Sequence, residues 1–554
     1  MRLAHSLLVC SALATQLQAQ CSEVKLLASD GDTLDRFGYS IGIDGDTMIV
    51  PAKHDEFPLA DQGTAYVFDW NGSAWIESQR LAASDAQAGA LFGWASHLNG
   101  DDWVVGATLH DGAGTNSGKV YAFERSAGSW TETQGLEAAD AAAQDFFGRA
   151  VAVSGDYLVV GAPQQDSAGT NAGCVYVFER SAGTWAQVQQ LFASDGAAED
   201  RFGWGLDLDG DRLVVGAYLH DAGSTDRGAV YVFDLVAGSF SESAKLVPAD
   251  ATGEFGWDLS LDGDLLAVGA PADAFYGQRS GAGYLYEHSA GTWSERLKFL
   301  AADGETFDRA GTSVAIEGTR MLVSSFLDDD MGSSSGSIYM LEEHAGAFSV
   351  THKLTASDGL PGDQFGRYIS LSAGRLAAAG LKCDDLGADS GAAYVFELPT
   401  AFVSYCYCDA GPCGNDESFS GCTTSAGAGA VLAGCGSASL AADDLVLTAS
   451  GVPANQFGLM FMGGAEHQSP LGDGQLCVNA GSQGLYRFNV DHSGPSGELV
   501  WGPGLSAYAA SSLPAGAMLS AGATWNFQVW FRDPAGPCGS GNGTTNAVAV
   551  TFAP

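Results

Sequence analysis

The chain has 554 residues with 66 acidic and 24 basic side chains, which gives a formal net charge of −42 at pH 7. Such a surface repels nucleic acid and anionic membranes and attracts cations, so we exclude nucleic acid as a partner. The acidity has two interpretations, solubility in a salty medium or cation binding. With 46% hydrophobic residues and 75 glycines, the sequence predicts a folded protein with many tight turns and therefore many strands.

The first 20 residues, MRLAHSLLVCSALATQLQAQ, have the pattern of a secretory signal peptide. Arg2 provides the positive end, residues 7–14 the short apolar stretch, and Ala19 a small residue before the expected cleavage point. This stretch is too short for a membrane span, and no later stretch reaches that length. We therefore expect an exported protein, secreted or at the cell surface, without a membrane span.

A Phe-Gly dipeptide recurs along residues 21–400 with a nearly constant spacing. It begins at Phe37, Phe92, Phe147, Phe202, Phe255 and Phe365, and Ala310-Gly311 fills the one vacant place. The steps are 55, 55, 55, 53, 55 and 55 residues. A period of this size indicates seven structural repeats.

Each repeat is expected to form four short strands. In the fourth, RFGWGLDLDG alternates large and small residues, and the strand patterns RLVVGA, GAVYVFD and SFSESAKL follow it. Two-residue turns such as Asp209-Gly210 join the first strand to the second. Seven such units predict an all-β fold, a seven-bladed β-propeller over 21–400. Residues 22–30 are similar to the end of a fourth strand, so we expect the N-terminus to complete the last blade.

These motifs carry a family resemblance. Phe-Gly followed by VVGAP (159–163) or AVGAP (267–271) resembles the FG-GAP repeat of integrin α-subunit propellers, in the compact form found in secreted bacterial proteins. The resemblance covers about 22–400 and implies a propeller that serves recognition or adhesion, and some lectins also use it. The integrin form places a calcium loop between strands one and two.

That calcium loop is absent here. The acidic stretch with Asp207, Asp209 and Asp211 offers only a two-residue turn, and Ca²⁺ needs six to eight oxygen ligands wrapped around it. We therefore predict a hairpin at this position. No cofactor is required, and calcium stays an option only at other acidic loops.

Two columns of acidic residues are predicted on one face of the propeller. The loops that precede the first strands contribute Asp30, Asp85, Asp140, Asp195, Asp250, Asp303 and Asp358. The loops between the second and third strands contribute Glu56, Asp111, Asp166, Asp221, Asp329 and Asp384, with Asp273 one place off. Such residues either bind a cation or ligand, or cap the backbone of their own loops. Two loops hold the densest carboxylates, which are the metal-binding candidates Asp30, Asp32, Asp35, Asp303, Glu305 and Asp308.

The residue after each Phe-Gly varies and is often aromatic or Arg. We predict that six of these residues face an axial pocket and bind a ligand: Tyr39, Trp94, Arg149, Trp204, Trp257 and Arg367. Packing between blades is the alternative interpretation. The chain contains no catalytic motif that we recognise, so we predict no catalytic residues and no enzyme activity.

The last part of the chain is rich in cysteine. We predict a Cys-rich linker at 401–422 and a β-sandwich at 423–554, similar to a C-terminal module found on many secreted bacterial proteins. The disulfide candidates are Cys21, Cys406, Cys408, Cys413, Cys422, Cys435, Cys477 and Cys538. Cys21 is suggested to pair with Cys406 or Cys408.

We expect an exported, non-catalytic recognition or adhesion protein whose partner is an extracellular protein or a glycan. One alternative is a lectin-like glycan binder that uses the aromatic and Arg positions. Another is a polysaccharide hydrolase or lyase, which needs a carboxylate pair that is not repeated in every blade. The oligomeric state is left open.

Overall fold

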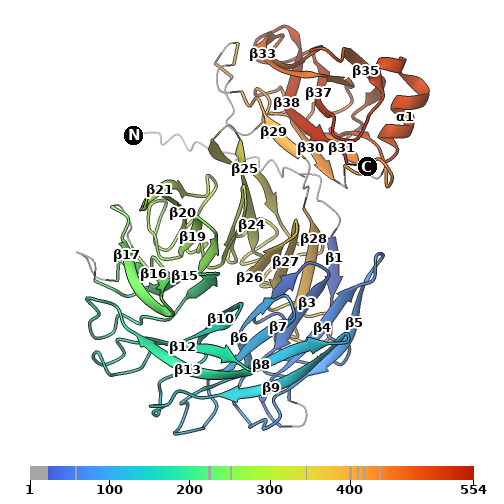
Figure 1. Cartoon of the computed structure of the whole chain (residues 1–554). Coiled ribbons are helices and arrows are strands. Elements are labelled where there is room, and N and C mark those ends of the chain that lie inside the picture. The colour runs from blue at the N-terminus through green and yellow to red at the C-terminus, as the bar shows by residue number, and fades with distance from the viewer. Residues whose placement is uncertain are drawn as a thin grey trace, which may run out of the picture. The chain divides into compact units, whose positions relative to one another are not determined.

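The computed structural model describes residues 23–56, 59–221, 226–249, 253–344, 346–398, 402–408, 411–412, 414–415, 420–427, 429–435, 438–443 and 445–553. It divides into two compact units, a larger one formed by Glu23–Glu343 and His352–Glu397, and a smaller one that contains His344–Thr351 and the chain from Leu398 onward. Both are built almost entirely from antiparallel strands, as Figure 1 shows. The signal-peptide prediction falls on residues 1–20, outside the described part.

The larger unit consists of seven four-stranded antiparallel sheets, as predicted. The first six take their strands in chain order, and the first two sheets are β2 (Gly42–Asp44), β3 (Thr47–Ala52), β4 (Thr64–Trp70) and β5 (Trp75–Leu81), then β6 (Phe92–Asn99), β7 (Asp102–Ala107), β8 (Lys119–Ser126) and β9 (Ser129–Leu136). The third and fourth sheets are β10 (Ala150–Ser154), β11 (Tyr157–Ala162), β12 (Cys174–Ser181) and β13 (Thr184–Leu191), then β14 (Leu206–Asp209), β15 (Arg212–Ala217), β16 (Ala229–Val236) and β17 (Ser239–Leu246). The fifth and sixth sheets are β18 (Leu259–Asp262), β19 (Leu265–Ala270), β20 (Ala282–Ser289) and β21 (Thr292–Phe299), then β22 (Val314–Glu317), β23 (Arg320–Ser325), β24 (Ser337–His344) and β25 (Ala347–Leu354).

The seventh sheet joins the two ends of the larger unit. It contains β26 (Phe365–Ser372), β27 (Arg375–Gly380) and β28 (Ala392–Glu397), and its fourth strand is β1 (Glu23–Leu26). All four residues of β1 pair with β28, which lies beside it in Figure 1. The N-terminal segment therefore completes the last sheet, as the sequence predicts.

Burial along the strands explains their composition. The second strands, such as β15, are buried on both faces after their first residue, because a further sheet packs against each face. After its first residue, β15 therefore consists of Leu, Val, Gly and Ala. The fourth strands, such as β17, alternate between buried and exposed side chains because one face meets solvent.

Hydrogen bonds link each sheet to the next around the unit. At six of the seven boundaries, a side chain at the end of an innermost strand accepts a backbone N–H from the hairpin of the following sheet. The donor and acceptor pairs are Gly100–Asp44 (2.6 Å), Gly210–Ser154 (3.1 Å), Gly263–Asp209 (2.8 Å), Gly318–Asp262 (2.5 Å), Ala373–Glu317 (2.7 Å) and Gly45–Ser372 (3.2 Å). The last pair joins the seventh sheet to the first, which is the arrangement of blades in a β-propeller.

The glycine of Phe-Gly allows two sheets to approach closely. Gly203 has a φ of 89°, and a Cβ placed on Gly161 of the preceding sheet would lie 2.0 Å from the Gly203 carbonyl oxygen. Because the chain turns here, β14 begins only at Leu206. The prediction of one continuous strand from Phe202 is therefore wrong for this repeat. Phe202 is buried, whereas Trp204 lines a cavity.

The smaller unit is a sandwich of two sheets on one core. The sheets are β29–β38–β37–β32–β35 and β30–β31–β36, and a hairpin β33–β34 stands beside them. The elements are β29 (Phe402–Tyr405), β30 (Val431–Cys435), β31 (Val446–Ser450), β32 (Phe457–Gly463), β33 (Ala465–Leu471), β34 (Gly474–Asn479), β35 (Leu485–His492), β36 (Leu499–Trp501), α1 (Leu505–Ser512), the short 3₁₀ turn η1 (Ala515–Ala517), β37 (Thr524–Asp533) and β38 (Gly541–Thr551). Leu447 and Phe527, one from each sheet, are fully buried in the shared core.

The region predicted as a linker is part of this sandwich. β29 pairs along its whole length with β38, so the unit begins before residue 423. Cys406–Cys477 and Cys408–Cys422 form disulfides, and Cys538 is also disulfide-bonded. The suggested pairing of Cys21 with Cys406 or Cys408 is wrong, because both of these residues have other partners. Cys21 and Cys413 lie outside the described residues, as does the side chain of Cys435.

Candidate functional site

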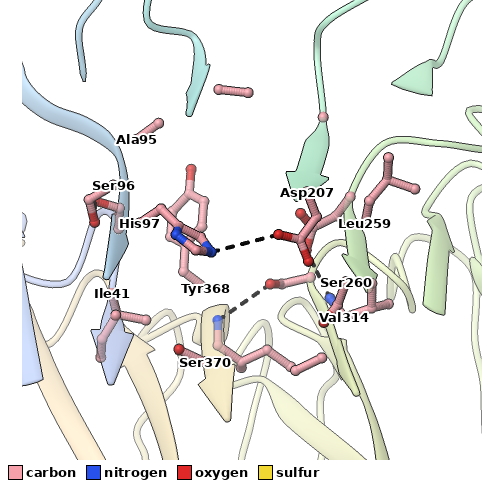
Figure 2. Close-up of a pocket in the computed structure, with 18 of the residues that line it drawn as sticks. Ile41, Ala95, Ser96, His97, Asp207, Leu259, Ser260, Val314, Tyr368 and Ser370 are labelled. Carbon is pink, nitrogen blue, oxygen red and sulfur yellow. Dashed lines mark hydrogen bonds and ion pairs between the residues drawn. The ribbon is translucent and has the colours of Figure 1, made fainter. Parts of the chain in front are cut away.

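A cavity of about 460 Å³ lies at the centre of the larger unit. All seven sheets line it with residues of their innermost strands and of the turns before these strands. Figure 2 shows His97 and Asp207 pointing toward each other across this space, with Ser260, Tyr368 and Ser370 nearby. The size is within the range of small-molecule sites in proteins, about 300–1,000 Å³.

The polar residues in the middle of the cavity wall join neighbouring sheets. In four repeats, the side chain five places after the Phe position accepts a backbone N–H of the next sheet. The donor and acceptor pairs are Val153–His97 (3.3 Å), Leu261–Asp207 (2.7 Å), Ile316–Ser260 (3.1 Å) and Ile43–Ser370 (3.2 Å). The first pair links the second and third sheets, which, among the described residues, is the one boundary of the seven without a hydrogen bond from the hairpin described above.

Two carboxylates and one imidazole in the wall are not repeated in the other sheets. His97 Nε2 lies 3.6 Å from Asp207 Oδ1, and Asp258 Oδ2 accepts the Val314 N–H at 2.9 Å. Burial lowers the pKa of His97 and raises that of Asp207, and it raises the pKa of Asp258 to about 6. Each of the three side chains is therefore biased toward its neutral form while it holds two sheets together.

The six predicted ligand-binding residues come together near this cavity. We call them, with Thr312 at the seventh position, the axial belt: Tyr39, Trp94, Arg149, Trp204, Trp257, Thr312 and Arg367. All except Tyr39 line the cavity, and all except Thr312 are half-buried. Tyr39 packs on Trp94 with ring centroids 5.4 Å apart. Five of the six predicted residues therefore lie in the wall of one cavity, and ligand binding by them stays a prediction.

Aromatic and cationic groups contact one another around the belt. The Arg149 guanidinium lies 3.8 Å from the centroid of Trp204, whose ring is 5.1 Å from that of Trp257. Arg367 lies 4.4 Å from the centroid of Phe326. Among the described residues, Arg149 Nε, Arg367 Nη1 and Trp204 Nε1 are buried without a hydrogen-bond partner. The belt therefore offers both apolar faces and unsatisfied donors.

Sequence reasoning missed a second set of side chains behind the belt. These residues occupy the place after the Val-Gly-Ala motif or the tripeptide that replaces it, where two repeats have Pro163 and Pro271: Lys53, Tyr218 and Phe326. The Lys53 ammonium lies 3.2 Å from the centroid of Tyr39 and 4.0 Å from that of Trp94. The replacement of proline by a large side chain at this position is the feature of the sequence that could have identified these residues.

The acidic columns serve two structural roles. In the first column, each of six Asp residues accepts the hydroxyl of a Tyr on the third strand of its sheet: Asp30–Tyr66, Asp85–Tyr121, Asp140–Tyr176, Asp195–Tyr231, Asp303–Tyr339 and Asp358–Tyr394. In the second column, five Asp residues accept an N–H five residues later in their own loop, which is the predicted capping role: Asp111, Asp166, Asp221, Asp329 and Asp384.

The metal-binding candidates are held by protein groups. Asp30 pairs with Arg80, while Asp35 and Asp308 accept the backbone N–H groups of Asp32 and Glu305. Among the described residues, the one set of three possible metal ligands within 4.8 Å of one another is Asp303, Asp328 and Asp330. The Lys353 ammonium already lies 2.7, 2.9 and 2.6 Å from these three carboxylates.

Replacing Lys353 by Met should turn this cluster into a calcium-sensitive one. The change leaves three carboxylates, one of them 3% exposed, without their cation, so we expect a loss of about 3 kcal/mol of stability. Millimolar calcium should then raise the melting temperature of K353M but not that of the wild type, as measured by scanning calorimetry. The control is K382M, which removes a half-buried Lys elsewhere. Equal stabilisation of wild type and K353M would contradict this view of the cluster.

Seven four-stranded sheets around an axial cavity define a repeat protein of the propeller type. The model of the FG-GAP repeat family matches residues 21–68, 75–123, 130–178, 185–233, 240–286, 293–341 and 348–396. The chain therefore belongs to the FG-GAP repeat family. None of the curated proteins matches it.

Proposed function

We propose that the protein is a non-catalytic recognition protein that acts outside the cell and binds its ligand at the axial belt. The observation that carries the proposal is the convergence of half-buried aromatic rings and unsatisfied Arg donors on one cavity. Aromatic and Arg side chains of this kind commonly supply the binding energy at recognition sites. FG-GAP repeats are often recognition modules, which agrees with the proposal.

The variation of the belt also supports a binding role. Residues that only pack between sheets, such as Phe37 and Phe202, are nearly identical in every repeat and fully buried. The belt differs from repeat to repeat and keeps part of its surface exposed. A surface that varies on a constant scaffold is typical of a binding site.

The structure favours binding over the hydrolase or lyase alternative. That alternative requires a carboxylate pair with free oxygens, and Asp207 and Asp258 are the unrepeated carboxylates of the cavity. Both accept backbone N–H groups from the following sheet, so each has a structural task. We therefore propose no catalytic role for them.

Extracellular action is supported by the disulfides of the smaller unit, because such bonds persist in oxidising compartments. No helix in the described ranges is long and apolar enough to cross a membrane.

The test is binding of the full chain to arrays of glycans and extracellular proteins, with calcium and with EDTA. We expect binding that EDTA leaves unchanged and that W204A weakens by about tenfold or more. The matched control is W293A, since Trp293 is also half-buried beside an Arg, Arg212, but does not line the cavity. Loss of binding in EDTA would indicate that the ligand binds at the acidic loops through a metal ion and would contradict the proposed site. Equal loss in both variants would contradict a role for the belt.

A further inference from the structure

We propose that the axial belt binds a carboxylated sugar, as a single residue or a short acidic oligosaccharide, with the carboxylate held by Arg149 and Arg367 beside Lys53. The inference rests on the proposed function and names the class of ligand. It is carried by three basic side chains without counter-ions in a strongly acidic protein.

These three basic side chains differ from the other basic residues of the larger unit. Most of these form ion pairs, for example Lys353 with three carboxylates and Arg180 with Asp102. Lys53, Arg149 and Arg367 have no ion pair among the described residues, although acidic residues outnumber basic ones by 66 to 24. Arg149 and Arg367 line the cavity, and Lys53 packs against Tyr39 and Trp94 of the belt. Three basic side chains without an ion pair in so acidic a protein indicate that their counter-ion comes from outside.

The two Arg side chains face the same space from opposite sides. Arg149 belongs to the third repeat and Arg367 to the seventh, and both line the cavity. The charge of Arg367 nevertheless contributes to the lowered pKa of Arg149, after burial as the larger cause. Guanidinium groups bind carboxylates through paired, charge-assisted hydrogen bonds, and both have a free buried donor nitrogen.

Lys53 is the least expected of the three, because its side chain is only 4% exposed. A buried ammonium without a counter-ion is costly, and the aromatic faces of Tyr39 and Trp94 compensate only part of this cost. Burial, followed by the charges of Arg36, Arg149 and Arg367, lowers the pKa of Lys53 to about 6. Asp61 is the carboxylate that opposes this shift most, and His54 holds it at 2.7 Å.

The apolar part of the belt favours a sugar as the carrier of the carboxylate. Trp94, Trp204 and Trp257 present half-buried faces around a cavity of about 460 Å³, which has room for one or a few sugar rings. The net charge of −42 repels a long polyanion. A short ligand with few carboxylates therefore fits better than an acidic polymer.

Binding of a carboxylate should also bring a proton to the site. Near pH 7.5 the free protein holds Lys53 largely neutral, and a nearby carboxylate raises its pKa by favouring the ammonium form. Up to one proton is then taken up for each ligand bound. A neutral sugar does not produce this uptake.

Isothermal titration of the full chain provides the test. The probes are trisaccharides of glucuronic, galacturonic and mannuronic acid, each with its carboxyl-reduced neutral counterpart, in two buffers of different ionisation enthalpy. We expect at least one acid to bind about 10- to 100-fold more tightly than its neutral counterpart. R149Q should lose most of this preference while R149K retains part of it, K53M should abolish the proton uptake, and K382M should behave as wild type.

The outcomes separate this inference from the proposed function. Equal binding of acid and neutral sugars that W204A weakens would keep the belt as the site and overturn the carboxylate inference. Binding of a short Glu-rich peptide instead of any sugar would overturn the saccharide class. Binding of the acids that R149Q, K53M and W204A leave unchanged would overturn both proposals.

Discussion

A chain that starts at residue 27, and so lacks β1, should lose about 5 °C or more of its melting temperature. β1 is the outer strand of the seventh sheet, and without it β28 becomes an unpaired edge. Leu26 leaves the core, and Lys25 no longer neutralises Asp358 and Asp385 at 2.7 and 2.6 Å. Loss of a buried Leu costs about 2 kcal/mol, and uncompensated half-buried charges add to this cost.

The melting temperatures of the truncated chain, the V24A variant and the wild type are compared by scanning calorimetry. Val24 lies in the same strand but is 38% exposed, so V24A should unfold within a degree or two of the wild type. A truncated chain that unfolds at the wild-type temperature would show that the first strand does not hold the sheets together.

The protein should become more stable when the pH is lowered from about 7.5 to about 5. Burial raises the pKa of Asp35, Asp258 and Asp308 to about 6, whereas the ordinary value is 3.8. Between these values the three carboxyls bind more protons in the folded protein than in the unfolded chain, so the stability they contribute falls as the pH rises through this window. The lowered pKa values of Lys53 and His97 oppose part of this effect. One pKa unit corresponds to about 1.4 kcal/mol, and the three groups together account for several kcal/mol. Relief of the net charge of −42 acts in the same direction.

Thermal unfolding at a series of pH values measures this effect. The D35N and D308N double variant should show a flatter profile, because neither side chain can take up a proton. D101N removes one charge at an exposed position and should change the profile only slightly. A wild-type melting temperature that falls from pH 7.5 to pH 5 would contradict the prediction.

The repeat period made the seven sheets predictable, because each repeat carries the same local signals. Asp209-Gly210 is an example of what these local signals predict and what they do not predict. Its turn chemistry predicts the hairpin between β14 and β15, which the structure contains. It does not reveal that Asp209 accepts the N–H of Gly263 in the next sheet, because that bond depends on how two repeats stack.

The belt was predictable as a set of positions, but its chemistry was not. The place after each Phe-Gly fixes where Trp94 and Arg149 stand, since every repeat folds alike. Lys53 lies 41 residues before Trp94 in the sequence and reaches its ring only through packing between sheets. Likewise, no feature of the sequence near Asp303 indicates that Lys353 neutralises it. The sequence therefore makes these densely spaced carboxylates candidates for metal binding.

The most direct test of the axial belt is a crystal structure of the full chain with the best-bound array ligand or uronic acid trisaccharide. We predict ligand density inside the cavity, against the faces of Trp94 and Trp204 and within hydrogen-bond distance of Arg149. Density on the acidic loops or on the smaller unit, with an empty cavity, would contradict the account.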